Sequence, residues 1–271
     1  MAEDFSACAA GTKLYGDDFG PAEIAAWFED EREASVGLWY GEHTTYLDHA
    51  ANLRHGFRFL PPGRLDRVLG LGSAYGEEFL PILGRTDAVT IVEPSDVYVR
   101  HDIHGVPATY VKPRADGSLP FPDDHFVLAT CFGVLHHIPN VSAVVREMHR
   151  CVRPGGHLLI HEPTVSMGDW TKPRPGLTKR ERGIPYRILQ TIVNSAGFTV
   201  VKETRCCSST VSRLANRVKW PWRNSVPAVV LDELVCRLLP QDPPYHPSEL
   251  VKLAMIETVY YVLKKPERDG L

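Results

Sequence analysis

The sequence predicts an α/β fold built on a mainly parallel β-sheet, and three features support this prediction. Short apolar runs alternate with longer amphipathic segments, which is the pattern of strands joined by single helices. A glycine-rich turn at 70–76 lies where the first expected strand passes into the first expected helix. An acid, Glu93, directly follows the second expected strand. In a parallel sheet both features fall at the carboxyl edge, where ligands bind.

The expected elements follow one another in βα order. Strands are expected at 67–71, 88–92, 108–111, 126–131, 157–161, 198–205 and 255–264, where apolar residues gather. Helices are expected from the glycine turn to Leu83, over 141–151 and over 183–196, with glycine or proline soon after each. Because single helices separate most of these strands, parallel pairing with right-handed crossovers is expected.

Proline-rich stretches divide the chain. Residues 1–60 are predicted to form an N-terminal helical lid that ends at Pro61-Pro62-Gly63, a strong turn signal. Residues 61–271 are the expected core domain. Two of its segments, 162–182 and 206–253, break the βα alternation and are rich in proline, tryptophan and basic residues. We expect these two segments to be lids over the sheet.

Composition excludes several classes of protein. The chain has 271 residues, 44% of them hydrophobic, and a formal net charge of −3, which argues against disorder and against a dedicated nucleic-acid binder. No apolar run approaches the ~20 residues that span a bilayer, and the N-terminus lacks a secretory signal. The six cysteines include no C-x-x-C pair. We therefore expect a soluble, cytoplasmic protein with reduced thiols and neither a membrane nor a nucleic-acid partner; a homodimer is left open.

The glycine turn is the first candidate ligand site. Glycines allow a tight turn and a close approach of ligand to backbone, and the following helix N-terminus offers unpaired N–H groups. The spacing G-x-G-x-x-x-G differs from the G-x-G-x-x-G of dinucleotide enzymes, and no phosphate-binding G-x-x-x-x-G-K-[ST] loop occurs. A sharp turn that binds no ligand is the alternative.

Glu93 is the second candidate ligand residue. A carboxylate at the end of the neighbouring strand can accept hydrogen bonds from both hydroxyls of a ribose. The alternative is a solvated acid at a strand terminus. Taken together, the glycine turn and Glu93 predict a ligand that carries an adenosine.

Three further segments occur in a recognisable order. The segment L-P-F-P-D at 119–123 precedes the strand at 126–131, L-H-H at 135–137 follows it, and a basic helix ending in P-G-G at 154–156 precedes the next strand. This series, after a glycine turn and an acid, closely resembles the class I S-adenosylmethionine-dependent methyltransferases. The resemblance covers about residues 65–162 and, weakly, the terminal strands.

The resemblance implies a Rossmann-like, seven-stranded, mainly parallel sheet whose last strand is antiparallel. It also implies S-adenosylmethionine as cofactor and S-adenosylhomocysteine as product. The cofactor-binding residues implied are Gly70, Leu71, Gly72, Ser73, Ala74, Gly76, Glu93, Pro94, Ser95, Asp116, Gly117, Cys131, Phe132 and Leu135.

The chain departs from the family pattern at three positions. Gly70 stands where the first motif often begins with an acid, Ala74 replaces its second glycine, and Val127 replaces an acid that commonly follows Phe126. Loss of the first acid removes a usual hydrogen-bonding anchor. A catalytically silent protein that binds S-adenosylmethionine or S-adenosylhomocysteine is therefore an alternative to an enzyme.

Four residues are candidates for proton transfer. His136 and His137 follow the strand at 126–131, and His161 and Glu162 end the strand at 157–161. Methylation of an oxygen requires removal of its proton, and histidine titrates near neutral pH. Adjacent side chains point in different directions, so at most one of His136 and His137 is expected to be the base. The alternatives are that both are framework residues, and that His161 and Glu162 bind the following loop.

The substrate is expected to contact the lids. Trp170 and Arg174 in the basic loop, and Tyr40 in the N-terminal segment, are the candidate substrate-binding residues. No metal site is expected, because no cluster with ligand spacing stands out. The predicted function is methylation of a hydroxyl of a small polar metabolite, with a saccharide as one candidate acceptor. N- or C-methylation of a small molecule is the alternative.

Overall fold

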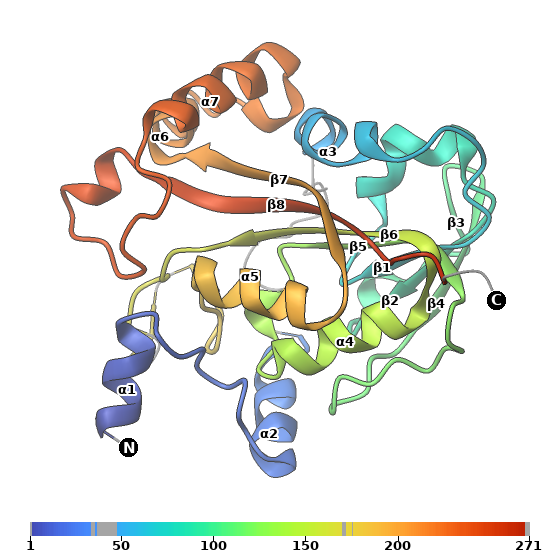
Figure 1. Cartoon of the computed structure of the whole chain (residues 1–271), viewed down its shortest axis with the longest axis horizontal. Coiled ribbons are helices and arrows are strands. Elements are labelled where there is room, and N and C mark those ends of the chain that lie inside the picture. Colours follow the sequence, from blue (N-terminus) through green and yellow to red (C-terminus); the bar gives the residue numbers. More distant parts are fainter. Residues whose placement is uncertain (1, 34–35, 37–47, 170–171, 175, 269–271) are drawn as a thin grey trace.

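A computed structural model describes residues 2–33, 36, 48–169, 172–174 and 176–268, and a single sheet runs through the middle of it (Figure 1). The sheet order is β3-β4-β2-β1-β5-β6-β8-β7. The strands are β1 Val68–Leu71, β2 Val89–Val92, β3 Asp102–Ile103, β4 Val106–Val111, β5 Phe126–Phe132, β6 Val152–Pro163, β7 Thr199–Ser208 and β8 Ile256–Lys264.

The pairing directions confirm the Rossmann-like prediction. β1 lies between β2 and β5 and is parallel to both, while β8 is antiparallel to β6 and β7. The described residues form eight strands rather than the expected seven, because the two-residue β3 folds back antiparallel on β4. Gly72 and Gly133 have positive φ and lie just beyond β1 and β5.

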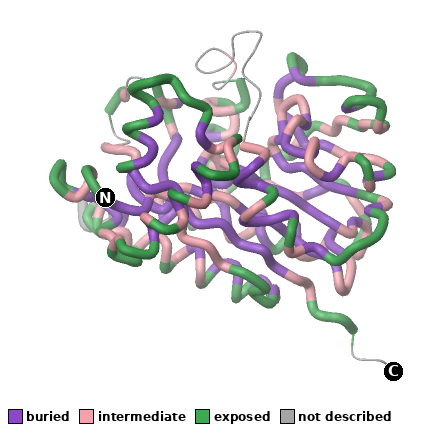
Figure 2. Tube along the Cα trace, turned by 90° about the horizontal axis from the view of Figure 1, so that it is seen from above, coloured by how far each residue is buried: buried purple, intermediate pink, exposed green. Residues whose placement is uncertain are grey.

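Helices cover both faces of the sheet (Figure 1). One face carries α4 Val141–Cys151 and α5 Tyr186–Ser195, and the other carries α3 His49–His55, α6 Ser209–Arg217 and α7 Val226–Leu238. Successive strand residues alternate between the two apolar clusters, so that Leu69 faces one and Val68 the other. Figure 2 shows the buried residues concentrated along the strands. No helix among the described residues has the length and apolar character needed to cross a bilayer.

Two predicted elements differ from those observed. The segment after the glycine turn is a 3₁₀ helix, Glu77–Arg85, and not an α-helix to Leu83, because Pro81 lies inside it and lacks the N–H that an α-helical turn requires. The strand expected at 157–161 is longer at both ends. Val152 pairs with Phe126 of β5 before a bulge, and Glu162 and Pro163 pair with β8.

The N-terminal residues divide between the two faces. The helices α1 Ala2–Ala9 and α2 Pro21–Glu31 lie on the side of α4 and α5, whereas α3 packs against α7 on the other side (Figure 1). The predicted lid at 1–60 therefore contributes to both faces in its described part.

A buried arginine connects the first lid to the sheet. Arg182 has no exposed surface, and its guanidinium lies 5.0 Å from the ring centre of Trp27 in α2. Its N–H groups donate at 2.8–3.2 Å to the carbonyls of Tyr15, His136, Ile138 and Pro139. Burial lowers the pKa of Arg182 to about 10, so the side chain stays charged at neutral pH. One cation thus links the N-terminal segment, the loop after β5 and the loop after β6.

We predict that Arg182→Met lowers the free energy of unfolding by about 3–5 kcal/mol, because four buried carbonyls lose a charged donor. Arg187→Met is the control, since Arg187 is exposed and pairs with Asp242 at the surface. That control should cost about 1 kcal/mol or less. Chemical denaturation of both variants measures the difference, and equal losses would contradict the prediction.

Candidate functional site

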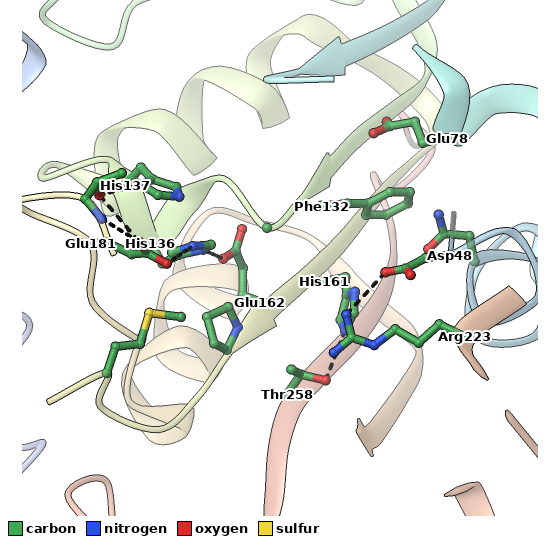
Figure 3. Close-up of a pocket in the computed structure, with 15 residues that line it drawn as sticks. Asp48, Glu78, Phe132, His136, His137, His161, Glu162, Glu181, Arg223 and Thr258 are labelled. Atoms are coloured by element: carbon green, nitrogen blue, oxygen red, sulfur yellow. Dashed lines mark hydrogen bonds and ion pairs between the residues drawn. The ribbon is translucent and has the colours of Figure 1, made fainter. Parts of the chain in front are cut away.

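Two neighbouring cavities lie at the carboxyl edge of the sheet, and they share one side chain. The smaller has a volume of about 130 Å³, the larger about 350 Å³, and His137 lines both. The larger cavity is drawn in Figure 3, with His136 and His137 on one side and His161 and Arg223 on the other. The shared position makes His137 the residue through which the two cavities meet.

The smaller cavity is built around the glycine turn. Four of the predicted cofactor residues line it: Leu71, Gly72, Pro94 and Gly117. Gly72 has φ +64°, and a Cβ there would lie 2.6 Å from the Val134 side chain, so only glycine fits. The other predicted cofactor residues are not among those that line this cavity: Gly70, Ser73, Ala74, Gly76, Glu93, Ser95, Asp116, Cys131, Phe132 and Leu135. Of these, Phe132 lines the larger cavity.

Glu93 joins the glycine turn to the end of β2. Its carboxylate accepts hydrogen bonds from the N–H groups of Ala74 at 3.2 Å and Ser95 at 3.1 Å. The side chain is buried, and burial raises its pKa to about 7. Ala74 adopts φ +45°, a conformation that costs a non-glycine residue energy and that these contacts stabilise. Alanine therefore occupies the second glycine position of the motif with its N–H directed at Glu93.

A different carboxylate lies behind the turn. A Cβ at Gly70 would overlap the hydroxyl of Ser73. That hydroxyl donates to Glu78 at 3.0 Å, and Thr130 of β5 donates to the same carboxylate at 2.5 Å. Burial raises the pKa of Glu78 to about 7. Position 70 lacks the acid of the family motif, but a buried acid, Glu78, lies eight residues later. No sequence motif indicated this residue.

The predicted cofactor residues Asp116 and Gly117 differ in their position relative to the smaller cavity, because only Gly117 lines it. Gly117 has φ +80°. The Asp116 carboxylate instead accepts from the backbone N–H and hydroxyl of Ser118, at 2.9 and 2.7 Å, and closes a local turn. Asp116 is exposed, and these hydrogen bonds stabilise the loop beside the smaller cavity.

The turn that carries the two histidines is held by Glu162. This carboxylate is completely buried at the end of β6 and accepts from the N–H groups of Val134 and Leu135 at 2.8 and 2.7 Å. It also lies 2.7 Å from Nδ1 of His136 (Figure 3). Glu162 is therefore placed to orient the turn after β5.

His136 lies between two acids. Its Nε2 is 3.6 Å from Glu181, opposite the contact with Glu162. Burial on its own would lower the pKa of His136, but the two carboxylates outweigh it and raise the pKa to about 9. The ring is therefore an imidazolium at neutral pH, which has no lone pair to accept a proton.

His137 has the opposite character. Burial and the positive charge of His136 lower its pKa, so the ring is neutral at physiological pH. Its Nδ1 lies 3.0 Å from the carboxylate of Glu31 in α2, and this contact assigns the proton to Nδ1. The remaining nitrogen, Nε2, then carries the lone pair. The arrangement is that of a base oriented by an acid.

Glu31 is itself held by the loop after β6. It accepts from the Thr178 hydroxyl at 2.5 Å and from the backbone N–H of Arg180 at 2.6 Å. Lys179 and Arg180 both pair with the neighbouring Asp30. The two lids that the sequence predicted separately therefore meet at His137.

Comparison with known proteins decides the family. A model of the methyltransferase domain matches residues 43–203, which is more than half of the chain. The chain belongs to the class I S-adenosylmethionine-dependent methyltransferases. A solved S-adenosylmethionine-dependent methyltransferase from Mesorhizobium loti has the same fold, with a TM-score of 0.54 at 17% identity over 80% of this chain and 99% of that one.

Curated relatives match the methyltransferase over a shorter stretch. A ubiquinone/menaquinone biosynthesis C-methyltransferase from Psychromonas ingrahamii is 32% identical over 106 residues, which is 35% of this chain and 42% of the relative. A ubiquinone biosynthesis O-methyltransferase from Proteus mirabilis is 31% identical over 67 residues, 24% of this chain and 27% of the relative. The chain thus spans less than half the length of either.

The residues of this methyltransferase fit its cofactor, S-adenosylmethionine. The absence of a Cβ at Gly72 leaves space for a ligand against the backbone of the turn. The buried Glu93 carboxylate lies at the end of β2. A carboxylate there suits the two ribose hydroxyls, and the apolar lining of Leu119 and Val134 suits an adenine ring.

His161 lies on the far side of the larger cavity from His137. Its Nε2 is 3.0 Å from the Thr258 hydroxyl of β8, and its ring stacks on Tyr260 with centres 5.2 Å apart. Its Nε2 also lies 4.0 and 3.9 Å from the sulfurs of Cys206 and Cys207. His161 and Glu162 are therefore separate in function, since Glu162 points into the turn after β5.

Of the predicted substrate residues, Arg174 alone belongs to the part of the chain that the structure describes. Tyr40 and Trp170 lie outside the described residues. Arg174 is described, and its guanidinium donates to the carbonyls of Met167 and Thr178 at 3.2 and 3.1 Å, which stabilises its own loop. Sequence reasoning missed the lining residues Asp48, Thr178, Glu181, Arg223 and Thr258, and the acid Glu31. Glu31 is 106 positions from His137, so no local spacing could have paired them.

We predict that Glu93→Ala weakens binding of S-adenosylhomocysteine by about 1.5–3 kcal/mol, or roughly 10- to 150-fold, because a charged acceptor is lost. Asp96→Ala is the control, as Asp96 belongs to the same loop but is exposed. Calorimetry measures both affinities. An unchanged affinity for Glu93→Ala would contradict the assignment of this acid to the ribose.

We predict that Glu78 makes the fold less stable as the pH rises. An acid whose folded pKa is about 7, above its usual 4.5, binds more protons when folded, so stability is highest below pH 4.5 and falls through pH 7. Between pH 4.5 and 8, the free energy of unfolding of the wild type should fall by up to about 3 kcal/mol relative to that of Glu78→Gln. Denaturation at several pH values measures this loss. Glu147→Gln is the control with the opposite sign, because Arg150 lowers the pKa of Glu147. Parallel curves for Glu78→Gln and wild type would contradict the prediction.

Proposed function

We propose that the protein transfers a methyl group from S-adenosylmethionine to a hydroxyl of a small polar metabolite, with His137 as the general base. The observation that carries this proposal is the position and protonation state of His137. It lines both cavities, is neutral, and has Nδ1 occupied by Glu31. Family membership supports S-adenosylmethionine as the cofactor. The volume of the larger cavity, about 350 Å³, supports a small molecule as the acceptor.

The two cavities supply the positioning that methyl transfer requires. Bound in the smaller cavity, the cofactor supplies an electrophilic methyl group on a sulfonium. An in-line displacement then depends mainly on holding the acceptor at the correct distance and angle. The larger cavity, at about 350 Å³, is within the range of small-molecule pockets and adjoins the smaller one at His137.

The proton of the acceptor hydroxyl passes to Nε2 of His137. The ring becomes an imidazolium, and the Glu31 carboxylate 3.0 Å from Nδ1 stabilises that charge. His136 is already charged, so its role in this scheme is positioning, through Glu162 and Glu181. The lid residues Thr178 and Arg180 keep Glu31 in place.

The larger cavity carries groups suited to a polar acceptor. Four acids and the hydroxyl-bearing Thr178 and Thr258 are among its lining residues, and Asp48 and Arg223 form an ion pair at 3.5 Å. Such groups form directional hydrogen bonds with hydroxyls, and a saccharide is the class to test first. A homodimer stays a prediction.

C-methylation is the second candidate. The relative from Psychromonas ingrahamii is named as a C-methyltransferase, and the same base could remove a proton from an activated ring. A silent cofactor-binding protein is the third, motivated by Gly70 and Ala74. Against it stand the Glu78 carboxylate behind the turn and the Ala74 N–H directed at Glu93.

A labelling experiment distinguishes these candidates. The protein is incubated with ¹³C-methyl S-adenosylmethionine and a panel of hydroxylated and phenolic metabolites, and the carbon shift of the product identifies an O-, N- or C-methyl group. O-methyl products support the proposal and C-methyl products support the second candidate. Binding of S-adenosylhomocysteine with no product from any acceptor would favour the silent protein, and no binding would overturn all three.

We predict that His137→Ala lowers kcat/KM by about 100-fold or more while the affinity for S-adenosylhomocysteine stays unchanged. Glu31→Gln should lower it less and move the onset of activity to lower pH, because Glu31 raises the pKa of His137. His125→Ala is the control, since the His125 ring meets the Phe126 ring edge to face at the opposite end of β5. Full activity of His137→Ala would contradict the assignment of the base.

A further inference from the structure

A second cluster of reactive side chains lies at the far wall of the larger cavity. It contains His161 at the end of β6 and the adjacent Cys206 and Cys207 at the end of β7, with Thr258 of β8 between the two strands. Both cysteines are buried and carry free thiols, and His161 is half-buried. The methyl-transfer scheme above uses none of them.

The three ligand atoms have nearly the spacing of a metal site. Nε2 of His161 lies 4.0 Å from Sγ of Cys206 and 3.9 Å from Sγ of Cys207, and all three atoms lie within 4.8 Å of one another. Zinc binds sulfur at about 2.3 Å and nitrogen at about 2.0–2.1 Å, so tetrahedral geometry places such atoms about 3.6–3.8 Å apart. The two nitrogen–sulfur separations exceed the tetrahedral value by a few tenths of an ångström.

Backbone strain brings the two cysteines together. Successive side chains of a strand normally point to opposite faces, which would separate Cys206 from Cys207. Here Cys207 has φ +60°, a conformation that L residues avoid, so the strand bends at this point. The carboxylate of Asp232 in α7 holds the bend by accepting from the N–H groups of Cys207 and Ser208 at 2.8 and 2.7 Å. Strain of this kind persists where the surroundings enforce it and is concentrated at functional sites.

We propose that His161, Cys206 and Cys207 bind one zinc-class divalent cation, with its fourth position open to the larger cavity. Thiolate and imidazole ligands select such a cation over magnesium or calcium. Three protein ligands with one open position are the arrangement of catalytic rather than structural zinc sites. His161 and Thr258 both line the cavity, which gives the open position access to a small molecule.

Binding changes the protonation of the cluster in a defined way. The two thiols release their protons to solvent as two metal–sulfur bonds form. Nε2 of His161 must give up its contact with Thr258, so its proton moves to Nδ1. The Thr258 hydroxyl keeps its own partner, because it already donates to the carbonyl of Cys206 at 3.1 Å.

The open position has a consequence for the acceptor. A hydroxyl or thiol bound to the cation would lose its proton more readily, because the cation stabilises the anion. This consequence rests on the proposed function, since it places part of the acceptor opposite His137. Metal binding itself does not rest on that function and is tested separately.

The test uses the full-length protein, purified under reducing conditions, treated with a chelator and titrated with Co²⁺. One equivalent should bind and give a sulfur-to-metal charge-transfer absorption, which Zn²⁺ abolishes by displacement. Cys206→Ser, Cys207→Ser and His161→Ala should each weaken Co²⁺ binding by more than the 10- to 100-fold typical of losing an outer partner. Cys151→Ser is the control, because Cys151 is a buried cysteine in α4.

Thermal melting identifies variants that fail to fold, and Cys206→Ala, which leaves the strained residue intact, serves if Cys207→Ser does not fold. Absence of Co²⁺ binding by the reduced protein would overturn the proposal. It would also be overturned if Cys151→Ser lost as much Co²⁺ affinity as the three ligand variants. Calorimetry with S-adenosylhomocysteine on the same metal-free sample reports on the proposed function independently. Cofactor binding without Co²⁺ binding therefore removes the metal site alone.

Discussion

The buried charge of Arg182 is the interaction on which the arrangement of the site depends. A cation without exposed surface is costly unless its donors are satisfied, and here backbone carbonyls of the N-terminal segment and of the loop after β5 satisfy them. Two of those carbonyls flank His137. The loop after β5, the N-terminal segment and the loop after β6 must therefore assemble together, and displacing one of them leaves the cation unpaired. This requirement explains why segments remote in sequence converge on one histidine.

Buried carboxylates have a similar organising role at the carboxyl edge of the sheet. Glu162 accepts hydrogen bonds from N–H groups of the turn after β5, and Glu93 accepts one from the turn after β1. Glu78 accepts hydrogen bonds from the hydroxyls of Ser73, in the turn after β1, and of Thr130 in β5. Each acid fixes a loop that would otherwise be free to move. The result is a site whose electrostatics are set by the scaffold, with one charged and one neutral histidine side by side.

Local sequence patterns were sufficient for the sheet and for the cofactor turn. Apolar runs, glycines and the acid after β2 are local signals, and they predicted the strands and the position of Glu93. Roles that arise from distant contacts were not accessible. The pairing of Glu31 with His137, and that of Glu78 with Ser73 and Thr130, depend on the tertiary structure, as does the bend at Cys207. Pro81 shows that a single residue can also override a helical pattern.

The origin of Glu31 in α2 has an evolutionary consequence. The acid that tunes the proposed base belongs to the segment before the sheet, whereas the cofactor turn and both histidines belong to the sheet and its loops. Replacement of the N-terminal segment would therefore alter the basicity of His137, and because Trp27, Phe28 and Arg32 of the same segment line the smaller cavity, it would reshape that cavity as well. A common scaffold of this kind can acquire new acceptors by exchanging a short leading segment.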